Sequence, residues 1–135
     1  MTGGMTGLPL RVSRVFTQAD FDRFAELSGD DNPIHVDPAF SAETRFGRTV
    51  AHGMLLYAAL WGLIRGVFPD AIQESQDLMF PAPTYADEPV FLEVDLLERP
   101  EPDRLVLAVR VLSGRAGAPT LEGRTRIRLA GGATP

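Results

Sequence analysis

Eight residues from Ser28 to His35, SGDDNPIH, bring together side chains that could move a proton. The segment holds Asp30, Asp31, Asn32 and one of the only two histidines in a chain of 135 residues. Histidine is the side chain whose unperturbed pKa lies nearest neutrality. A carboxylate and an imidazole that share one water molecule can perform general acid–base chemistry, one accepting the water's proton and the other donating to a substrate.

Proline makes this segment stiffer than its length suggests. Pro33 fixes its own backbone and keeps Asn32 out of the helical region. A stiff segment can hold Asp30 and His35 facing each other across one water molecule, with Asn32 hydrogen-bonded within the segment to hold its shape. The same residue types also build ordinary turns, so on residue types alone a purely structural turn remains open.

Metal binding is the other chemistry that these side chains suggest. One histidine and two aspartates could hold a hard cation, but the sequence offers no further anchored ligand, so we predict no metal. The chain has no cysteine, which excludes disulfides, thiolate catalysis and cysteine-ligated zinc.

A second feature is His52-Gly53-Met54, at the start of a long apolar stretch. A helix that begins at Gly53 presents unpaired N–H groups and the positive end of its dipole. Glycine also lets a ligand atom approach the backbone closely, so a thioester carbonyl that gains negative charge could bind there. Alternatively, Gly53 only relieves crowding. For His52 we favour a structural role.

The elements that position these residues follow from helix-end signals and periodicity. Thr17 is predicted to cap a helix that ends at Gly29. Asp37 caps a second helix, which we expect to run to about Phe46 and to stop at Gly47. Residues 53–68 are apolar on nearly every face, which predicts a helix buried all round. The strand-like segments are 10–15, 78–80, 90–97, 105–112 and 121–129.

Several of these strands alternate between apolar and polar residues, so each has one dry and one wet face. A sheet curved around the apolar helix buries both, which predicts an α+β domain in which an antiparallel sheet wraps a central helix. Edge-to-edge pairing of two such sheets would protect their exposed edges, so we expect a dimer.

Composition narrows the function classes. The net charge of −5 argues against nucleic acid as a partner. The longest apolar stretch, Met54–Leu63, is too short to cross a membrane, and the first residues lack the pattern of a signal peptide. We therefore expect a single domain in the cytoplasm.

The stretch Phe24–Ser41, FAELSGDDNPIHVDPAFS, resembles the signature of the MaoC-like, or hydratase 2, family of (R)-specific enoyl-CoA hydratases. That signature is an aromatic residue, a spacer, Leu-Ser-Gly-Asp-x-Asn-Pro-aliphatic-His, and a small residue six positions later, here Ser41. The stretch Phe46–Leu56, FGRTVAHGMLL, is similar to the start of the family's central helix. A weaker likeness runs through QDLMFPAPTYADEPVFLEV to the C-terminus.

The resemblance implies a hot-dog fold over residues 9–131, with an overhanging segment that carries the catalytic loop. Residues 1–8 are mostly small and rich in glycine, so we expect them to form a flexible N-terminus. It implies a homodimer and syn hydration of trans-2-enoyl-CoA to (R)-3-hydroxyacyl-CoA without metal or redox cofactor. By position, Asp30 and His35 match the catalytic pair, Asn32 matches the motif's asparagine, and Gly53 matches the glycine whose N–H binds the thioester oxygen.

Two features leave alternatives open. Tyr57 and Trp61 lie four residues apart on one helix face, where they either narrow the acyl pocket or pack in the core. Arg124, Arg126 and Arg128 form either a solvated strand face or a phosphate-binding patch for CoA.

The rival functions are a dehydratase acting on acyl-carrier-protein or a specialised intermediate, a non-catalytic acyl-binding hot-dog subunit, and a hot-dog thioesterase. Because the hydration is reversible and only the carrier or acyl group differs, the motif does not separate hydratase from dehydratase. The intact Asp30 and His35 argue against the non-catalytic subunit.

Overall fold

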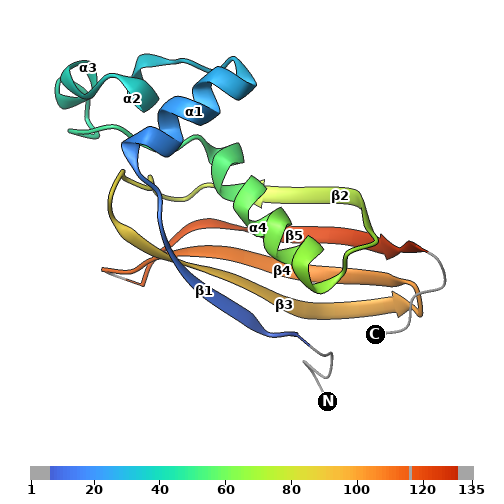
Figure 1. The fold of residues 1–135 in the computed structure, drawn as a ribbon. Coiled ribbons are helices and arrows are strands. Elements are labelled where there is room, and N and C mark those ends of the chain that lie inside the picture. Colours follow the sequence, from blue (N-terminus) through green and yellow to red (C-terminus); the bar gives the residue numbers. More distant parts are fainter. Residues whose placement is uncertain (1–6, 116, 131–135) are drawn as a thin grey trace.

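The fold is one antiparallel sheet with a helix lying along one of its faces (Figure 1). The computed structural model describes residues 7–115 and 117–130. The strand order is β1-β3-β4-β5-β2, and every pairing is antiparallel. This arrangement confirms the predicted α+β hot-dog fold. The elements are β1 Leu10–Val15, α1 Gln18–Ser28, α2 Pro33–Val36, α3 Pro38–Ala42, α4 Gly53–Val67, β2 Ala71–Met79, β3 Pro89–Glu101, β4 Arg104–Ser113 and β5 Pro119–Leu129.

The core lies between α4 and the concave face of the sheet. Leu92 on β3 pairs with Val111 on β4, and Val94 pairs with Val109, so buried side chains lie opposite one another. The predicted alternation is confirmed on β3 and β5. Each fully buried aliphatic side chain contributes about 1.5–3 kcal/mol to folding. The helix contributes Leu56, Tyr57, Leu60 and Ile64.

The prediction that the long apolar helix is buried all round is wrong. The sheet covers only one side of α4, and the residues of its other side are exposed. Because most of those residues are small, an almost wholly apolar helix leaves little apolar surface in water. The exposed positions are Met54, Ala58, Gly62, Arg65 and Gly66.

Helices α1 to α3 form an overhang above one end of the sheet, next to the start of α4 (Figure 1). The predicted cap of α1 is confirmed: Thr17 Oγ1 accepts from the Asp20 N–H at 3.2 Å, and the Asp20 carboxylate accepts from the Thr17 N–H at 2.9 Å. Gly29 ends this helix with φ of 81°, as predicted.

The second predicted helix differs from the observed one. Helix α3 ends at Ala42 rather than near Phe46, because the Thr44 hydroxyl donates to the Ser41 carbonyl at 2.7 Å and accepts from the Phe46 N–H at 3.2 Å. Such local side-chain bonds compete with helical ones. The short helix α2 was not predicted at all.

An edge strand and the N-terminal segment also differ from the sequence prediction. Strand β2 begins at Ala71, well before the predicted 78–80, because it is an edge strand whose mostly exposed side chains do not alternate. Leu8, expected in a flexible terminus, is 7% exposed and belongs to the core. Residues 1–6 and 131, which fall within the expected limits, lie outside the described residues. No helix in the described part of the chain is long and apolar enough to cross a bilayer.

Candidate active site

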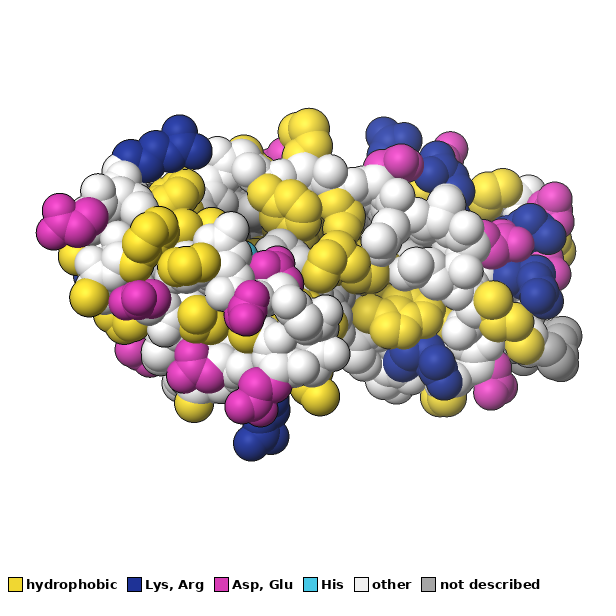
Figure 2. Space-filling model, turned by 90° about the horizontal axis from the view of Figure 1, so that it is seen from above, with side chains coloured by type: hydrophobic (Ala, Val, Ile, Leu, Met, Phe, Trp, Pro, Cys, Tyr) yellow, Lys and Arg dark blue, Asp and Glu magenta, His cyan; other side chains and the backbone are white. Residues whose placement is uncertain are grey.

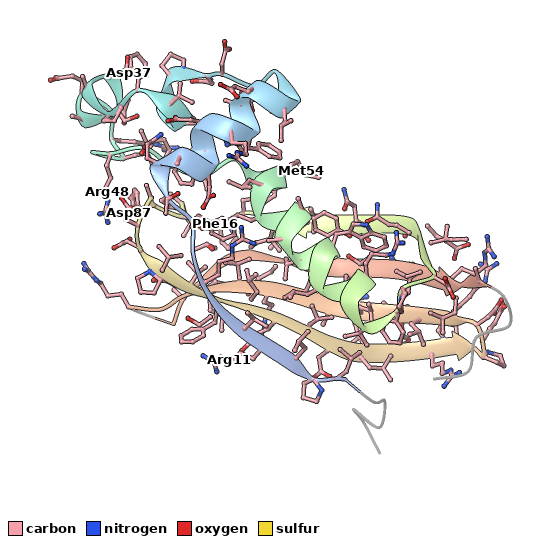
Figure 3. The ribbon with its side chains drawn as sticks, viewed as in Figure 1. Arg11, Phe16, Asp37, Arg48, Met54 and Asp87 are labelled. Carbon is pink, nitrogen blue, oxygen red and sulfur yellow. The ribbon has the colours of Figure 1, made fainter. Side chains whose placement is uncertain are left out.

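The main cavity, about 630 Å³, lies where the overhang meets the start of α4. Asp30, His35 and Gly53 all line it, so the fold brings together three residues for which the sequence predicts roles in catalysis. Figure 3 places Met54, another lining residue, at the first turn of α4 beside the overhang. Seen from above, hydrophobic side chains gather over the middle of this face and almost no histidine surface shows (Figure 2). The pair of predicted catalytic residues therefore lies in an apolar cavity, with its histidine covered.

The backbone fixes the proton on His35. Nδ1 of His35 lies 2.7 Å from the carbonyl oxygen of Val50. A carbonyl can only accept a hydrogen bond, so Nδ1 carries the proton and Nε2 of the neutral ring has a free lone pair. This Nε2 lies 3.7 Å from Oδ2 of Asp30. That distance is too long for a direct hydrogen bond, but one water molecule at about 2.8 Å from each atom can bridge them.

Asp30 is held by its own loop and by α4. Its N–H donates to Ser28 Oγ at 3.1 Å, and its carbonyl oxygen lies 2.9 Å from Nε2 of His52. Asn32 accepts the Ile34 N–H at 3.1 Å and so caps α2, the helix that carries His35. The predicted hydrogen bond of Asn32 within the segment is thus confirmed.

Gly53 sits at the first position of α4 with the ring of Phe80 against it. A Cβ atom at this position would lie 2.6 Å from Cζ of Phe80, so the reading that Gly53 relieves crowding is correct. The helix has no side-chain cap at His52. Within the described residues the Gly53 N–H has no hydrogen-bond acceptor, so it is free to bind an oxygen in the cavity.

Beneath the cavity, two threonines tie the last strand to the start of α4. The Thr84 hydroxyl donates to Thr120 Oγ1 at 2.8 Å, and the Thr84 carbonyl accepts the Ala51 N–H at 2.8 Å. Both threonines line the cavity. The position of Gly53 therefore depends on contacts that reach β5.

Tyr57 and Trp61 do not line this cavity. They border a separate hollow of about 330 Å³. Tyr57 is buried, its hydroxyl donates to Gln73 on β2 and lies 2.9 Å from Thr125 Oγ1 on β5, and burial raises the pKa of the Tyr57 phenol. Met54 is common to both spaces. Tyr57 is therefore a core residue, and Met54 is the residue that the hollow and the main cavity share.

A metal is the other ligand that the site could attract. One ligand atom each from Asp30, His35 and His52 lie within 4.8 Å of one another. The two imidazoles are stacked, however, with ring centroids 3.8 Å apart and an interplanar angle of 23°. Nearly parallel rings direct their lone pairs side by side rather than at one ion, so this arrangement would have to change to bind zinc. That the site uses no metal stays a prediction.

The three arginines of β5 face carboxylates rather than an open patch. Arg126 lies 3.2 Å from Asp77, and Arg128 lies 3.9 Å from Glu74, both on β2. Arg124 is opposite Asp77 in the strand register. These contacts favour the solvated strand face over a phosphate-binding patch.

Sequence reasoning missed Arg45, which lines the main cavity and lies over the ring of Phe46, 4.9 Å from its centroid. Among the described residues it has no carboxylate partner. Nothing in the sequence separates this arginine from other exposed ones, because only the fold of the overhang brings it to the cavity.

The comparisons with known proteins agree with this geometry. A family model described as MaoC like domain matches residues 6–110. The chain is 34% identical over 125 residues to the (R)-specific enoyl-CoA hydratase of Aeromonas caviae, covering 91% of this chain and 93% of that protein. It is 39% identical over 109 residues to the 3-hydroxybutyryl-CoA dehydratase of Methylorubrum extorquens, covering 76% and 67%.

Solved structures give the same result. The (R)-hydratase of A. caviae involved in PHA biosynthesis superposes with a TM-score of 0.86 and 33% identity, covering 96% of each chain. The R-hydratase PhaJ1 of Pseudomonas aeruginosa gives a TM-score of 0.84 and 31% identity, covering 93% of this chain and 81% of that one.

Proposed function

Because this chain belongs to the MaoC-like family, we propose that it is an (R)-specific enoyl-CoA hydratase, which adds water reversibly to trans-2-enoyl-CoA to give (R)-3-hydroxyacyl-CoA. The observation that carries the proposal is the 3.7 Å separation between Asp30 Oδ2 and His35 Nε2 in a cavity that the Gly53 N–H also borders. Water activation and stabilisation of a thioester oxygen are the two requirements of this reaction.

The geometry supplies a mechanism. The Asp30 carboxylate and the free Nε2 of His35 are both acceptors, so one water molecule can donate one hydrogen to each. Its oxygen then presents a lone pair to the β-carbon of the enoyl group. As the new C–O bond forms, the pair takes one proton from the water and returns a proton to the α-carbon on the same face. The result is syn addition of water.

Negative charge accumulates on the thioester oxygen between these two events. The Gly53 N–H and the positive end of α4 stabilise this charge where it develops. Loss of one such donor typically costs about 10²–10³ in rate.

We infer a route for the acyl chain from Met54, which lines both the main cavity and the hollow beside Tyr57. From the main cavity it would pass Met54 and reach the hollow bordered by Tyr57 and Trp61, so these two residues would limit chain length. The anionic carrier would lie near Arg45, the one Lys or Arg side chain among the described residues that line the main cavity.

The assembly and location that we propose are a homodimer in the cytoplasm, each chain forming a single domain whose core includes Leu8. Strand β2 is an edge strand with unpaired backbone groups and with Ile72 and Met79 exposed. Edge pairing of two β2 strands would satisfy these groups. Light scattering of the purified protein measures whether the mass is that of two chains.

The test is the loss of enoyl-thioester ultraviolet absorbance with crotonyl-CoA and a longer trans-2-enoyl-CoA. We expect turnover by the wild type, production of the (R)-3-hydroxy thioester, and loss of activity in folded Asp30→Asn and His35→Ala variants. Release of free CoA without loss of the enoyl group would identify a thioesterase instead. Activity only on the acyl-carrier-protein thioester would identify the dehydratase alternative, and full activity of both variants would refute the assigned pair.

A further inference from the structure

His52 is a buried titratable residue that the mechanism above does not use. It is 2% exposed and directly precedes Gly53. As the N-cap of α4 it makes no side-chain hydrogen bond to the helix. Serine, threonine, aspartate and asparagine favour this position because they do make that bond. Helix initiation therefore does not explain a histidine here.

The ring instead contacts both members of the catalytic pair. Its Nε2 lies 2.9 Å from the carbonyl oxygen of Asp30, and because a carbonyl only accepts, Nε2 carries the proton. One face of the ring stacks on His35, with centroids 3.8 Å apart. Phe24 on α1 meets it edge to face at 4.8 Å. A single rigid ring thus joins the backbone at one catalytic residue to the side chain of the other.

The hydrogen bond from His52 connects the loop of residues 29–32 to the start of α4. The side chain of Asp30 is 55% exposed, and its other hydrogen bonds reach only Ser28 and Asn32 within the same segment. In the described part of the chain, the bond from His52 is the one hydrogen bond that ties residues 29–32 to α4. Without it, no hydrogen bond between the described residues would link Asp30 to a residue outside the overhang.

We propose that His52 is a positioning residue: its neutral ring, bonded to the Asp30 carbonyl and stacked on His35, sets the separation between the two catalytic side chains. This inference rests on the proposed function, since it concerns the geometry of the same pair. It gives a direct role to a histidine for which the sequence favoured a merely structural one.

The ring is built to remain neutral. Burial lowers the pKa of His52, and the neighbouring His35 lowers it further, whereas the hydrogen bond to Asp30 and the Asp30 carboxylate oppose this. Nδ1 of His52 is buried with no hydrogen-bond partner among the described residues. A second proton there would create an unpaired buried donor, which is costly.

The first test reads the tautomers directly by nitrogen NMR of the imidazoles at neutral pH. The chain has two histidines, so a His35→Asn variant assigns both sets of signals. We expect opposite tautomers: His52 protonated on Nε2 and His35 protonated on Nδ1. A His52 ring protonated on Nδ1, or exchanging between tautomers, would overturn the proposal. This result does not depend on enzymatic activity.

The second test separates the donor from the ring. His52→Gln places an amide N–H near the former Nε2, whereas His52→Phe keeps an aromatic ring without a donor. Misplacement of a reacting group by about 1 Å can cost roughly 10²-fold, so we expect a kcat loss of that order in His52→Phe with little change in KM. We expect His52→Gln to retain kcat to within about tenfold, a loss of about 1.4 kcal/mol in transition-state stabilisation.

Thermal melts of both variants complete the design. The proposal is overturned if His52→Phe keeps the wild-type kcat. It is also overturned if both variants lose kcat equally and in proportion to their loss of Tm. If the wild type itself turns over no enoyl thioester, the proposed function fails, and the tautomers still decide whether Nε2 of His52 donates to the Asp30 carbonyl.

Discussion

The carbonyl oxygen of Val50 lies 2.7 Å from Nδ1 of His35, so one backbone group decides which nitrogen of this ring is free to act as a base. His35→Asn tests this relationship, because the asparagine amide can still donate to Val50 but offers no base at the position of Nε2. We expect a folded protein with a kcat reduced about 10²–10⁴-fold, measured with crotonyl-CoA. Unfolding by urea provides the control. Near-normal turnover by His35→Asn would remove His35 from the chemistry.

Gly53 and Phe80 define a second relationship. In Gly53→Ala the new methyl group would lie 2.6 Å from the end of the Phe80 ring. Phe80 is half exposed and its ring can move, so we expect a stability loss below the ~1–3 kcal/mol typical of overpacked cores. Because Gly53 also lines the cavity, a methyl group there would hinder an oxygen from reaching its N–H, so we expect kcat/KM to fall by at least about 10²-fold.

A Gly53→Ala/Phe80→Leu double variant separates the two effects. Removal of the ring should restore the free energy of unfolding while activity stays low. If activity returns together with stability, steric crowding by Phe80 alone explains the effect of Gly53→Ala. The Gly53 N–H then has no part in the reaction.

Arg45 should lower the KM for thioesters whose carrier is negatively charged and should have no effect on the KM for an uncharged thioester. An exposed ion pair contributes about 0.2–1 kcal/mol, so Arg45→Ala should raise KM for crotonyl-CoA by about 1.4–5-fold, and less at high ionic strength. Turnover of the uncharged crotonyl-N-acetylcysteamine thioester should be unaffected. Arg23→Ala, an exposed arginine on α1 that does not line the cavity, is the matched control. An equal KM change for both thioesters would show that Arg45 does not contact the carrier.

Trp61 should limit chain length if the acyl group passes Met54. Trp61→Ala enlarges the far hollow, and pocket contacts of this size typically change selectivity by about tenfold or more. We expect the ratio of kcat/KM for octenoyl-CoA to that for crotonyl-CoA to rise by about tenfold. An unchanged ratio in a folded variant would mean that substrates do not reach this hollow.

The lowered pKa of His52 predicts a stability slope at mildly acid pH. An unfolded histidine titrates near 6.5, above the folded value, so between the two pKa values the unfolded state holds a proton that the folded state lacks. The contribution of His52 to the free energy of unfolding should therefore be constant above about pH 6.5. It should fall as the pH decreases from there towards the folded pKa of His52. Urea unfolding between pH 7.5 and 5 measures it.

His52→Phe is the control for this slope, because this variant lacks the His52 imidazole and keeps every other ionisable side chain. The difference between wild type and variant isolates His52. Parallel curves for the two proteins would contradict the assigned shift.

The sequence predicted the elements whose signals are local. Thr17 and Gly29 marked the ends of α1 because caps depend on side chains one turn away, and the alternation on β3 marked its buried face. It predicted Asp30 and His35 together because they lie five positions apart in one segment. It did not predict α2, since four residues are too few to show a period.

Contacts between residues that lie far apart in the chain could not be predicted from the sequence. The open side of α4 depends on how far the sheet curls, which no single segment encodes. The bond between His52 and the Asp30 carbonyl joins positions 22 residues apart through the backbone of one of them, so no pattern of residue types reveals it. Arg45 reaches the cavity only because α3 stops early and turns follow.

The threonine pair beneath the cavity has a consequence for biosynthesis. Thr120 belongs to β5, the last of the five strands in chain order, whereas Asp30 and His35 precede the long helix and are translated earlier. Because the Thr84–Thr120 contact lies below the start of α4, the cavity can gain its complete lining only after β5 has been translated. A nascent chain that stalls before β5 would carry Asp30, His35 and Gly53 but would lack the strand that supports their cavity.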